Sequence, residues 1–273
     1  MNTRSLAAFR LAPLAGVGQS GPMSGRIAAL FRHPVKGFTP ERLVFADLAE
    51  GGWFPCDRIY AVEDGPSGFD PAAPAFTPKI RFAVLAKIAD VANVRTTYNE
   101  ADGVLAVEAG GRPPERFRLS EPEGREAFAG WLQQFLGDGA SGPLKVQSAP
   151  GHRFTDHPQG HVSIINLASV RDLEYRLGKP VDPLRFRANI YVEGWSAWAE
   201  NAMVGATLNL GDARAEVFKT IVRCTATEVD PATGERDLPV PSALFHHYGQ
   251  VVCGLYVTVT KGGRVTEGDE LNP

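Results

Sequence analysis

The stretch Ala213–Gly234, ARAEVFKTIVRCTATEVDPATG, combines two features around which the rest of the chain can be interpreted. Its first half is apolar and predicts a strand that ends near Val222. The turn signal Asp230–Gly234 follows, so Cys224 lies close to the end of that strand. The stretch therefore predicts a β-rich fold that presents a thiol at a strand end.

Cys224 stands beside Arg223, and an adjacent guanidinium favours the thiolate over the thiol. The thiolate is the form of cysteine that binds a soft or intermediate metal ion. A cysteine that only packs in the core of a buried strand would show the same pattern, and spacing does not separate the two. Cys224 is thus a candidate metal ligand and catalytic residue, with a core cysteine as the alternative.

The composition is that of an ordinary globular protein. Of the 273 residues, 44% are hydrophobic and 22% are charged, which suffices for one large domain or two small ones. The net charge of −3 provides no global positive field for nucleic acid or anionic lipid. Three cysteines without a close pair argue against a disulfide framework and a structural zinc site. An anionic ligand would need a local cluster of cations.

Residues 1–24 predict a disordered extension. Arg4 and Arg10 surround a short apolar run, Leu6–Val17, which faintly resembles a targeting peptide but is too short to span a bilayer. A start codon placed too early, before Met23, would explain the segment equally well. No other segment approaches the length of a membrane span. We therefore expect a cytoplasmic protein without membrane association.

The remaining segments predict mostly short strands, with two helices. Apolar residues recur at helical spacing over Glu121–Leu136, and Ser120 with Glu123 has the form of a capping box. A second helix is expected after Asn166. Alternating residues around Asp102-Gly103 predict a hairpin. Many short strands with few helices indicate a barrel or sandwich with helical additions.

Two short segments place a cation beside turn residues. Lys36 precedes Gly37, and this pair can bring an ammonium and a close backbone amide to a phosphate. Arg58 lies in the segment Cys56-Asp57-Arg58. A solvated surface lysine is the common alternative for such a pattern, so Lys36 alone indicates little.

A third segment contains two arginines. Arg185 and Arg187 alternate around Phe186, so they share one face if the segment is a strand, and Asn189 lies on that face too. Planar guanidinium groups and an amide suit a phosphate or the edge of a pterin. An exposed strand face is the alternative.

The histidines do not have the spacing of a metal motif. His152, His157 and His161 are close in sequence, but Pro158 and Gly160 interrupt any helix between them. We expect a flexible loop there. The chain also lacks GxGxxG, GxxxxGK[ST] and GxSxG patterns, which disfavours dinucleotide, P-loop and hydrolase functions.

With these segments in place, the chain resembles the MOSC family, named for the C-terminal domain of molybdenum cofactor sulfurases, from about Gly25 to Leu271. Residues 34–37 (PVKG) and 57–60 (DRIY) are similar to the PVKS and DRRW segments of the family's N-terminal β-barrel domain. The segments that resemble the MOSC domain itself are SIINLASVRDLE, DPLRFRANIYVEG, IVRCTATEVDPATGERD and GLYVTVTKGGRVTEGDEL. Gly37 departs from the serine or alanine usual after the lysine.

The resemblance implies a mostly β chain with α additions. It places an N-terminal β-barrel-like domain at residues 25–120 and a larger MOSC β-barrel domain at residues 121–273. It also implies a molybdenum cofactor of the molybdopterin type, whose metal is bound by a cysteine that matches Cys224. The positions that match the family's cofactor-binding motifs, or lie beside them, are Lys36, Arg58, Arg187, Asn189 and Arg223.

Three functions remain open at this point. The first is an oxidoreductase that reduces N-hydroxylated or other N-oxygenated small molecules with electrons from a separate partner protein. The second is a non-catalytic carrier of the cofactor or of sulfur, with Cys224 as a persulfide loaded by a sulfur donor. The third is a β-barrel protein whose site has decayed, although the presence of all four of Lys36, Arg58, Arg187 and Cys224 argues against it.

Overall fold

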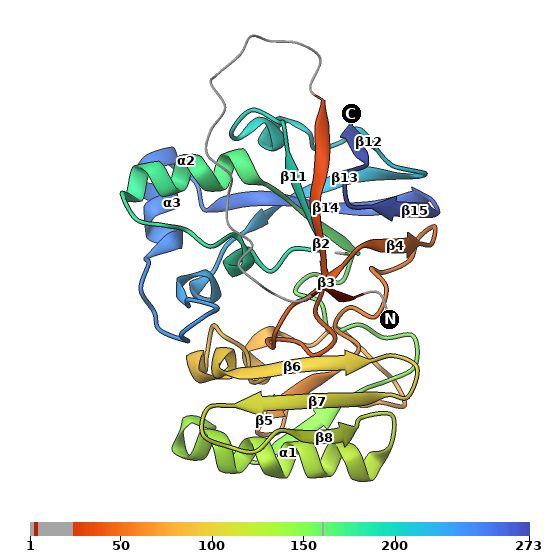
Figure 1. The fold of residues 1–273 in the computed structure, drawn as a ribbon, viewed down its shortest axis with the longest axis vertical. Helices are drawn as coiled ribbons and strands as arrows, with labels where there is room; N and C mark the ends of the chain where they lie inside the picture. Colours follow the sequence, from red (N-terminus) through yellow and green to blue (C-terminus); the bar gives the residue numbers. More distant parts are fainter. Residues whose placement is uncertain (1–2, 5–23, 160) are drawn as a thin grey trace.

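A computed structural model describes residues 3–4, 24–159 and 161–273 of the chain. The extension expected at residues 1–24 therefore lies largely outside the described residues. The described part forms two regions, a closed barrel and an N-terminal unit that packs against one end of it (Figure 1). In this part of the chain, no helix combines the length and apolar character needed to cross a bilayer.

The barrel is one sheet that closes on itself. Its first strand pairs with both its neighbour in the sheet and the last strand of the chain, so seven strands form a ring. In order around the ring these are β2 (Gly25–Arg32), β11 (Ile190–Glu193), β10 (Val162–Asn166), β14 (Val252–Lys261), β13 (Ala213–Val222), β12 (Thr207–Leu210) and β16 (Glu270–Asn272). Closure leaves no edge strand within the ring, which removes exposed backbone hydrogen-bonding groups. The expected mostly β fold with helical additions is confirmed.

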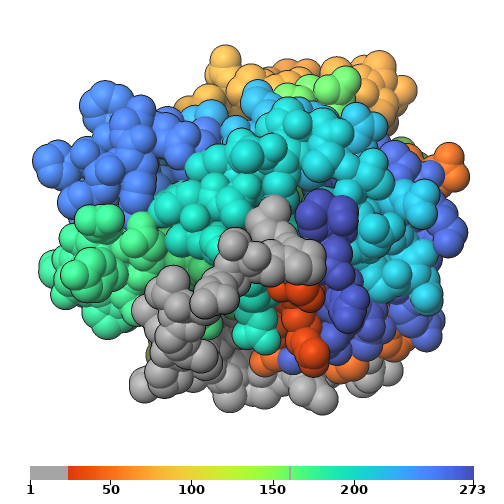
Figure 2. Space-filling view, turned by 90° about the horizontal axis from the view of Figure 1, so that it is seen from above, coloured from red at the N-terminus to blue at the C-terminus, as the bar shows by residue number. Residues whose placement is uncertain are grey.

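The ring closes where β16 pairs with β2, and Figure 2 shows from above the dark-blue C-terminal residues beside the orange-red start of β2. The remaining strands of this region extend the sheet or pair at its side. They are β1 (Thr3–Arg4) and β3 (Glu41–Leu43), which continue the sheet beyond β2, and the pair β4 (Phe45–Leu48) and β15 (Gly263–Thr266). The inside of the barrel is filled by aliphatic side chains such as Ile27, Ile164, Leu208 and Leu255, all fully buried.

Two helices cover one side of the barrel (Figure 1). β10 and β11 are parallel neighbours, and parallel strands need a crossover between them. α2 (Leu167–Leu177) provides this crossover. Its N-cap is Asn166, after which the helix was predicted, and the Asn166 side chain accepts a hydrogen bond from the Ala168 amide. Its C-cap is Gly178. α3 (Val240–Tyr248) packs beside it. The second predicted helix is confirmed.

The N-terminal unit has its own core. The hairpin expected at Asp102-Gly103 is confirmed as β6 (Val94–Asn99) and β7 (Val104–Ala109). α1 (Pro122–Leu136) confirms the first predicted helix, but the capping box is wrong, because the N-cap is Glu121 and no side chain caps it. The other elements of this unit are β8 (Glu115–Arg118), the pair β5 (Ala61–Asp64) and β9 (Leu144–Gln147), and the 3-10 turns η1 (Lys79–Arg81), η2 (Ala89–Asn93) and η3 (Gly137–Gly139).

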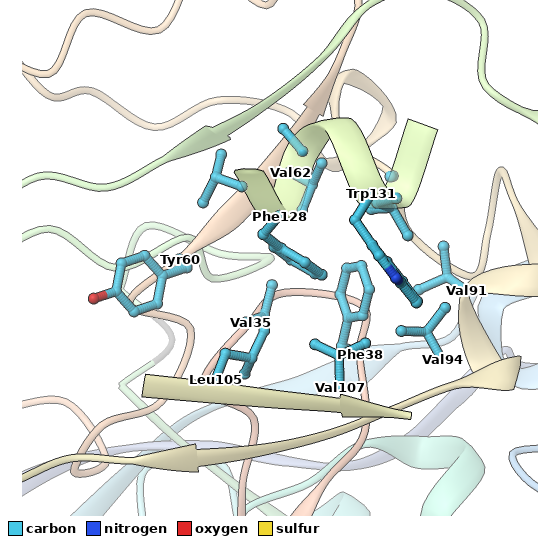
Figure 3. Close-up of a cluster of buried hydrophobic side chains, with 14 of the residues drawn as sticks. Val35, Phe38, Tyr60, Val62, Val91, Val94, Leu105, Val107, Phe128 and Trp131 are labelled. Carbon is cyan, nitrogen blue, oxygen red and sulfur yellow. The ribbon is translucent and has the colours of Figure 1, made fainter. Parts of the chain in front are cut away.

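Figure 3 shows this core, in which α1 places Phe128 and Trp131 over β7 and against the turn that contains Val35 and Phe38. The rings of Phe38 and Phe128 meet edge to face at 5.8 Å. The two regions interleave along the sequence, since β2 belongs to the barrel whereas α1 belongs to the N-terminal core. The domain boundary predicted at residues 120 and 121 stays a prediction.

Candidate cofactor-binding site

One cavity lies where the two regions meet, with a volume of about 320 Å³. Its walls come from the turns of the N-terminal unit, from the loop before β10 and from the ends of barrel strands β11, β13 and β14. All six residues proposed from the sequence line this cavity, although Lys36 and Cys224 lie 188 positions apart in the sequence. They are Lys36, Arg58, Arg187, Asn189, Arg223 and Cys224.

A short parallel bridge brings the first two cations together. Val35 pairs with Tyr60, the amide of Lys36 donates to the Tyr60 carbonyl at 2.8 Å, and the amide of Arg58 donates to the His33 carbonyl at 2.7 Å. Val35 and Tyr60 are buried in the N-terminal core, so hydrophobic packing holds both cations at the rim of the barrel. The Lys36 side chain is only 4% exposed.

Asp57 organises the surroundings of Arg58. Its carboxylate accepts from the His33 amide at 2.7 Å, contacts the His33 ring and forms an ion pair with Arg58. Burial alone would raise the pKa of Asp57, but Arg58 and His33 outweigh it and hold that pKa well below its usual range. Burial, together with the nearby charge of Arg187, lowers the pKa of His33 to about 3. His33 is therefore neutral at physiological pH.

Arg187 differs from the sequence-based expectation. Residues 183–186 form the 3-10 turn η4 (Pro183–Phe186), with Asp182 capping the Leu184 amide, so the hypothesis that Arg185 and Arg187 share a strand face is wrong. Pro183 fixes its own φ for the first turn position, and this favours the helical turn over an extended segment. Arg187 follows in the left-handed region at φ 51°. A non-glycine residue held there indicates a functional constraint on the backbone.

The guanidinium of Arg187 forms no direct ion pair within the described residues. Its Nη2 atom is buried and has no hydrogen-bond partner there. Burial and the neighbouring charge of Arg58 lower the pKa of Arg187 to about 10. A buried donor without a partner is costly, typically about 1–3 kcal/mol, and more for a charged group. Arg187 is therefore suited to an anionic ligand that enters the cavity.

The side chains of Asn189 and Arg223 form hydrogen bonds with other parts of the protein. The Asn189 side chain accepts from Ser163 and donates to the Phe31 carbonyl, so it ties β10, β11 and β2 together. Arg223 donates to the Cys253 carbonyl at 2.7 Å and to the Phe186 carbonyl at 2.9 Å. Both residues line the cavity, but their polar groups mainly fix its walls. Their role as cofactor ligands stays a prediction.

Cys224 follows β13, as expected, and is the N-cap of the 3-10 turn η6 (Thr225–Glu228). Its thiol is half-buried, whereas Cys56 and Cys253 are buried. The alternative of a fully buried core cysteine therefore does not describe Cys224. The ammonium of Lys79 donates to its sulfur at 3.1 Å.

Sequence reasoning missed Lys79 and Asp156. Asp156 forms ion pairs with Lys36 and, at 3.5 Å, with Lys79, and its side chain is 40% exposed. Burial would raise the pKa of Asp156, but the two ammonium groups outweigh it and hold the pKa below its usual range. Lys79 follows a loop rich in Gly, Pro and Ala, and Asp156 precedes His157 in the expected flexible loop. In the sequence, the only feature that marks Lys79 and Asp156 as candidates is a charged side chain next to turn residues.

The three clustered histidines do not converge. The rings of His152, His157 and His161 pack against Phe69 and Phe154, against Phe218 and Tyr256, and against Trp53, respectively. Among them only His157 lines the cavity. Three separate aromatic contacts give these imidazoles structural positions rather than a common centre.

Gly37 has a geometric reason to differ from the family pattern. Its φ is +93°, and a Cβ there would lie 2.9 Å from the Ala83 carbonyl oxygen and 3.1 Å from the Val84 Cα. Both contacts are with backbone, which cannot rotate away. The turn after Lys36 therefore requires glycine in this chain, and a serine hydroxyl at this position is excluded by space.

Charge dominates the cavity. Its walls hold seven cationic side chains and, within the described residues, one carboxylate, that of Asp156. Arg58 and Arg185 are paired with carboxylates behind the wall. The cations of the lining are Lys36, Arg58, Lys79, Arg185, Arg187, Lys219 and Arg223. The cavity therefore favours an anion although the chain as a whole is negative.

Two protein-family models match this chain. Residues 24–137 match the MOSC N-terminal beta barrel domain, and residues 151–272 match the MOSC domain. The chain belongs to the MOSC family. The resemblance inferred from the sequence motifs is confirmed. In this MOSC protein the cavity lies between the parts that the two domain matches cover.

Several curated proteins are similar to this MOSC protein. Mitochondrial amidoxime-reducing component 1 of Homo sapiens is 30% identical over 150 residues, which cover 48% of this chain and 43% of that protein. Mitochondrial amidoxime reducing component 2 of Rattus norvegicus is 32% identical over 120 residues, 40% of this chain and 35% of that protein. Molybdenum cofactor sulfurase of Drosophila erecta is 30% identical over 145 residues, 49% and 18% respectively. The matched segment covers less than half the length of each relative.

Solved structures are more distant. The crystal structure of the YUAD protein from Bacillus subtilis covers 91% of this chain and 94% of its own, with a TM-score of 0.46 and 14% identity. The YiiM protein from Geobacillus stearothermophilus covers 41% of this chain and 53% of its own, with a TM-score of 0.34 and 19% identity.

Proposed function

We propose that this MOSC protein binds a molybdenum cofactor of the molybdopterin type and reduces N-hydroxylated or other N-oxygenated small molecules. The observation that carries the proposal is the meeting of the half-buried thiol of Cys224 with an excess of cations in one cavity. Such a cofactor combines an anionic phosphate, a planar heterocycle and a metal that accepts a thiolate. Each of these groups has a counterpart in the cavity wall.

The residues present fit the cofactor. Arg187 has a buried donor atom without a partner among the described residues, as expected for a side chain that awaits an anion. In the proposed arrangement Lys36, Arg58 and Arg187 hold the phosphate and the pterin, and Cys224 binds the metal. Asn189 and Arg223 fix the wall through their hydrogen bonds to the barrel backbone. The cation arrangement is preformed, which lowers the cost of binding.

Family membership and the similarity to amidoxime-reducing components and to a molybdenum cofactor sulfurase support association with the molybdenum cofactor. The bound group would supply two-electron redox chemistry at the metal. The protein residues would orient the substrate beside Cys224 and exclude part of the solvent. The electrons would come from a separate donor protein. The cytoplasmic location likewise remains a proposal, since the relatives are named as mitochondrial.

A second candidate is a carrier of the cofactor or of sulfur. It is favoured by the similarity to the Drosophila sulfurase and by the partial exposure of Cys224, since a persulfide carrier needs an accessible thiol. In this function the thiol would accept a sulfur atom from a donor protein and pass it on. A substrate pocket beside the sulfur would not be needed.

The decisive test is metal analysis of the protein purified from a host that makes molybdenum cofactor, together with Cys224→Ser. We expect close to one molybdenum per chain in the wild type and none in the variant. Cys253→Ala is the matched control, because it removes a buried thiol outside the cavity and should keep the metal. Loaded protein would then be assayed with N-hydroxylated substrates and a reducing partner.

Normal molybdenum content in Cys224→Ser would disprove the ligand assignment. Molybdenum in neither protein would argue against the oxidoreductase and direct attention to persulfide formation at Cys224, measured by mass spectrometry after incubation with a sulfur donor.

A further inference from the structure

Lys79 has no role in the proposal above, yet it is the cation that contacts the sulfur. Its ammonium lies 3.1 Å from the Sγ atom of Cys224 and 3.5 Å from the Oδ2 atom of Asp156. It comes from η1, which follows a loop of the N-terminal unit, and reaches across to the end of barrel strand β13. The contact joins residues 145 positions apart in the sequence.

Lys79 and Lys36 occupy different depths of the same cavity. The Lys36 side chain is 4% exposed, whereas that of Lys79 is 34% exposed. Lys36 also donates to the Phe154 carbonyl at 2.9 Å, so two of its three donors are used by the protein. A small molecule that enters from solvent therefore reaches Lys79 and Cys224 before it reaches Lys36.

The donors of Lys79 are incompletely used. An ammonium has three N–H groups. The sulfur of Cys224 accepts one, and Asp156 faces the group at ion-pair distance. The carboxylate of Asp156 is shared with Lys36, so it cannot neutralise both lysines. In the described part of the chain, one N–H of Lys79 remains for a ligand beside the sulfur, in a cavity whose lining has more cations than carboxylates.

Part of the cavity wall is apolar. Val84, Leu85, Ala86 and Ala226 line the same cavity as Lys79 and Cys224. The cavity thus combines one ammonium at the sulfur with apolar wall residues. This combination suits a molecule with an anionic end and an apolar body.

We propose that Lys79 is a specificity-determining residue, which selects substrates carrying a carboxylate or a comparable small anionic group and holds that group beside Cys224. The proposal rests on the proposed function only in assuming that substrates approach Cys224. The selectivity itself belongs to the chain, and it is measurable without any cofactor.

The test compares two reagents of similar size that alkylate Cys224, anionic iodoacetate and neutral iodoacetamide, in protein from a host that makes no molybdenum cofactor. In both reactions the thiolate sulfur forms a bond to carbon while the carbon–iodine bond breaks and iodide leaves. Because both reagents attack the same thiolate, the ratio of their rates cancels any change in thiol ionisation. Peptide mass spectrometry assigns the label to Cys224 rather than to the buried Cys56 and Cys253.

We expect Lys79→Met to lower the iodoacetate-to-iodoacetamide rate ratio by roughly fivefold, the effect of one unit charge about 4 Å away in water-like surroundings. Lys79→Arg should keep most of the ratio, because it keeps the charge. Lys219→Met is the matched control, since Lys219 lines the cavity but is not bonded to Cys224. It should change the ratio less than about twofold, because an exposed charge farther from the sulfur is screened by water and salt.

A ratio for Lys79→Met within twofold of the wild type, an equal fall in Lys219→Met, or a Cys224 inert to both reagents would each overturn the proposal. None of these results bears on metal content, so failure here is distinguishable from failure of the proposed function. In loaded protein, Lys79→Met should raise KM for carboxylate-bearing substrates and leave KM for neutral ones nearly unchanged.

Discussion

The barrel and the N-terminal unit contribute to the same cavity in different ways. The barrel supplies Cys224 and Arg223 from the end of β13, and its backbone carbonyls bind Arg223. The N-terminal unit supplies Lys36 and Lys79 from turns, and the turn of Lys36 is held by a short parallel bridge and by the packing of Val35 and Phe38 in the N-terminal core. The sulfur thus sits on a hydrogen-bonded, closed frame, whereas Lys36, Arg58 and Lys79 sit on a region whose stability depends on its own core.

The site is more sensitive to packing defects on the side of the N-terminal unit. A closed sheet distributes its backbone hydrogen bonds around a ring, so a single packing defect leaves the ring connected. The N-terminal unit relies on a cluster of aromatic rings between α1, β7 and the turn that contains Lys36 (Figure 3). We therefore expect core defects in this unit to damage anion binding more than comparable defects in the barrel.

Phe128→Ala gives the largest expected effect. Phe128 is fully buried and packs on Phe38, two residues after Lys36. The truncation should cost about 4 kcal/mol of unfolding free energy, within the range for a large-to-small change in a core. It should also lower molybdenum content, because the turn that holds Lys36 loses its support. Denaturant unfolding and metal analysis measure both.

Leu208→Ala is the matched control for that prediction. Leu208 is fully buried inside the barrel and does not line the cavity. The change should cost about 2–5 kcal/mol but leave the molybdenum content of the folded protein unchanged. Equal loss of metal in both variants would show that the two regions do not differ in their support of the site.

Arg58 and Arg187 both adopt a left-handed backbone conformation, at φ 51°. Glycine relieves the backbone equally at both positions. Arg58→Gly should still destabilise by about 3 kcal/mol, because it leaves the buried Asp57 without its ion pair. Arg187→Gly should stabilise by about 1 kcal/mol, since it removes an unpaired buried charge and backbone strain.

Both glycine variants should lose molybdenum, and thermal unfolding separates them by the sign of the change in Tm. Destabilisation by Arg187→Gly with unchanged metal content would make Arg187 a structural residue rather than a ligand-binding one. Such a pairing of higher stability with lost function is expected of a binding residue that is strained in the free protein.

A further prediction concerns the pH dependence of stability at the junction of the two regions. His33 follows β2, and its pKa is lowered to about 3 by burial and by Arg187, whereas an unfolded histidine titrates near 6.5. Between these values the unfolded chain binds the proton and the folded chain does not, so stability falls as pH decreases from 6.5 towards 3. At pH 5 the loss should be roughly 2 kcal/mol.

His33→Gln should flatten this dependence between pH 4 and 6.5, as measured by urea unfolding across pH. Asp57 stays ionised throughout that range in the wild type because Arg58 and His33 hold its pKa low, and its ion pair with Arg58 remains in the variant, so it does not mask the effect. His246→Gln, at an exposed position on α3, should leave the profile as it is in the wild type. An unchanged slope in His33→Gln would assign the acid sensitivity to other groups.

Much of the local structure was predictable from the sequence. The apolar periodicity of α1 and α2, the Asp102-Gly103 hairpin and the position of Cys224 after a strand all follow from short-range patterns. Such patterns report which face of a segment is buried and where turns interrupt it. Two predictions failed through local competition, with a cap at Glu121 in place of Ser120 and a 3-10 turn at Pro183 in place of a strand. The helix α3 was not predicted.

Sequence motifs alone identified the family, the β-rich architecture and six residues suited to an anionic cofactor with a metal. The fold was needed to show that these six residues line one cavity and that Lys79 and Asp156 line it too. It also showed that the side chains of Asn189 and Arg223 form hydrogen bonds within the cavity walls. The physical reason is that charge pairing depends on distances of a few ångströms, set by packing between segments far apart in the chain. No local pattern encodes which lysine a folded barrel brings to its cysteine.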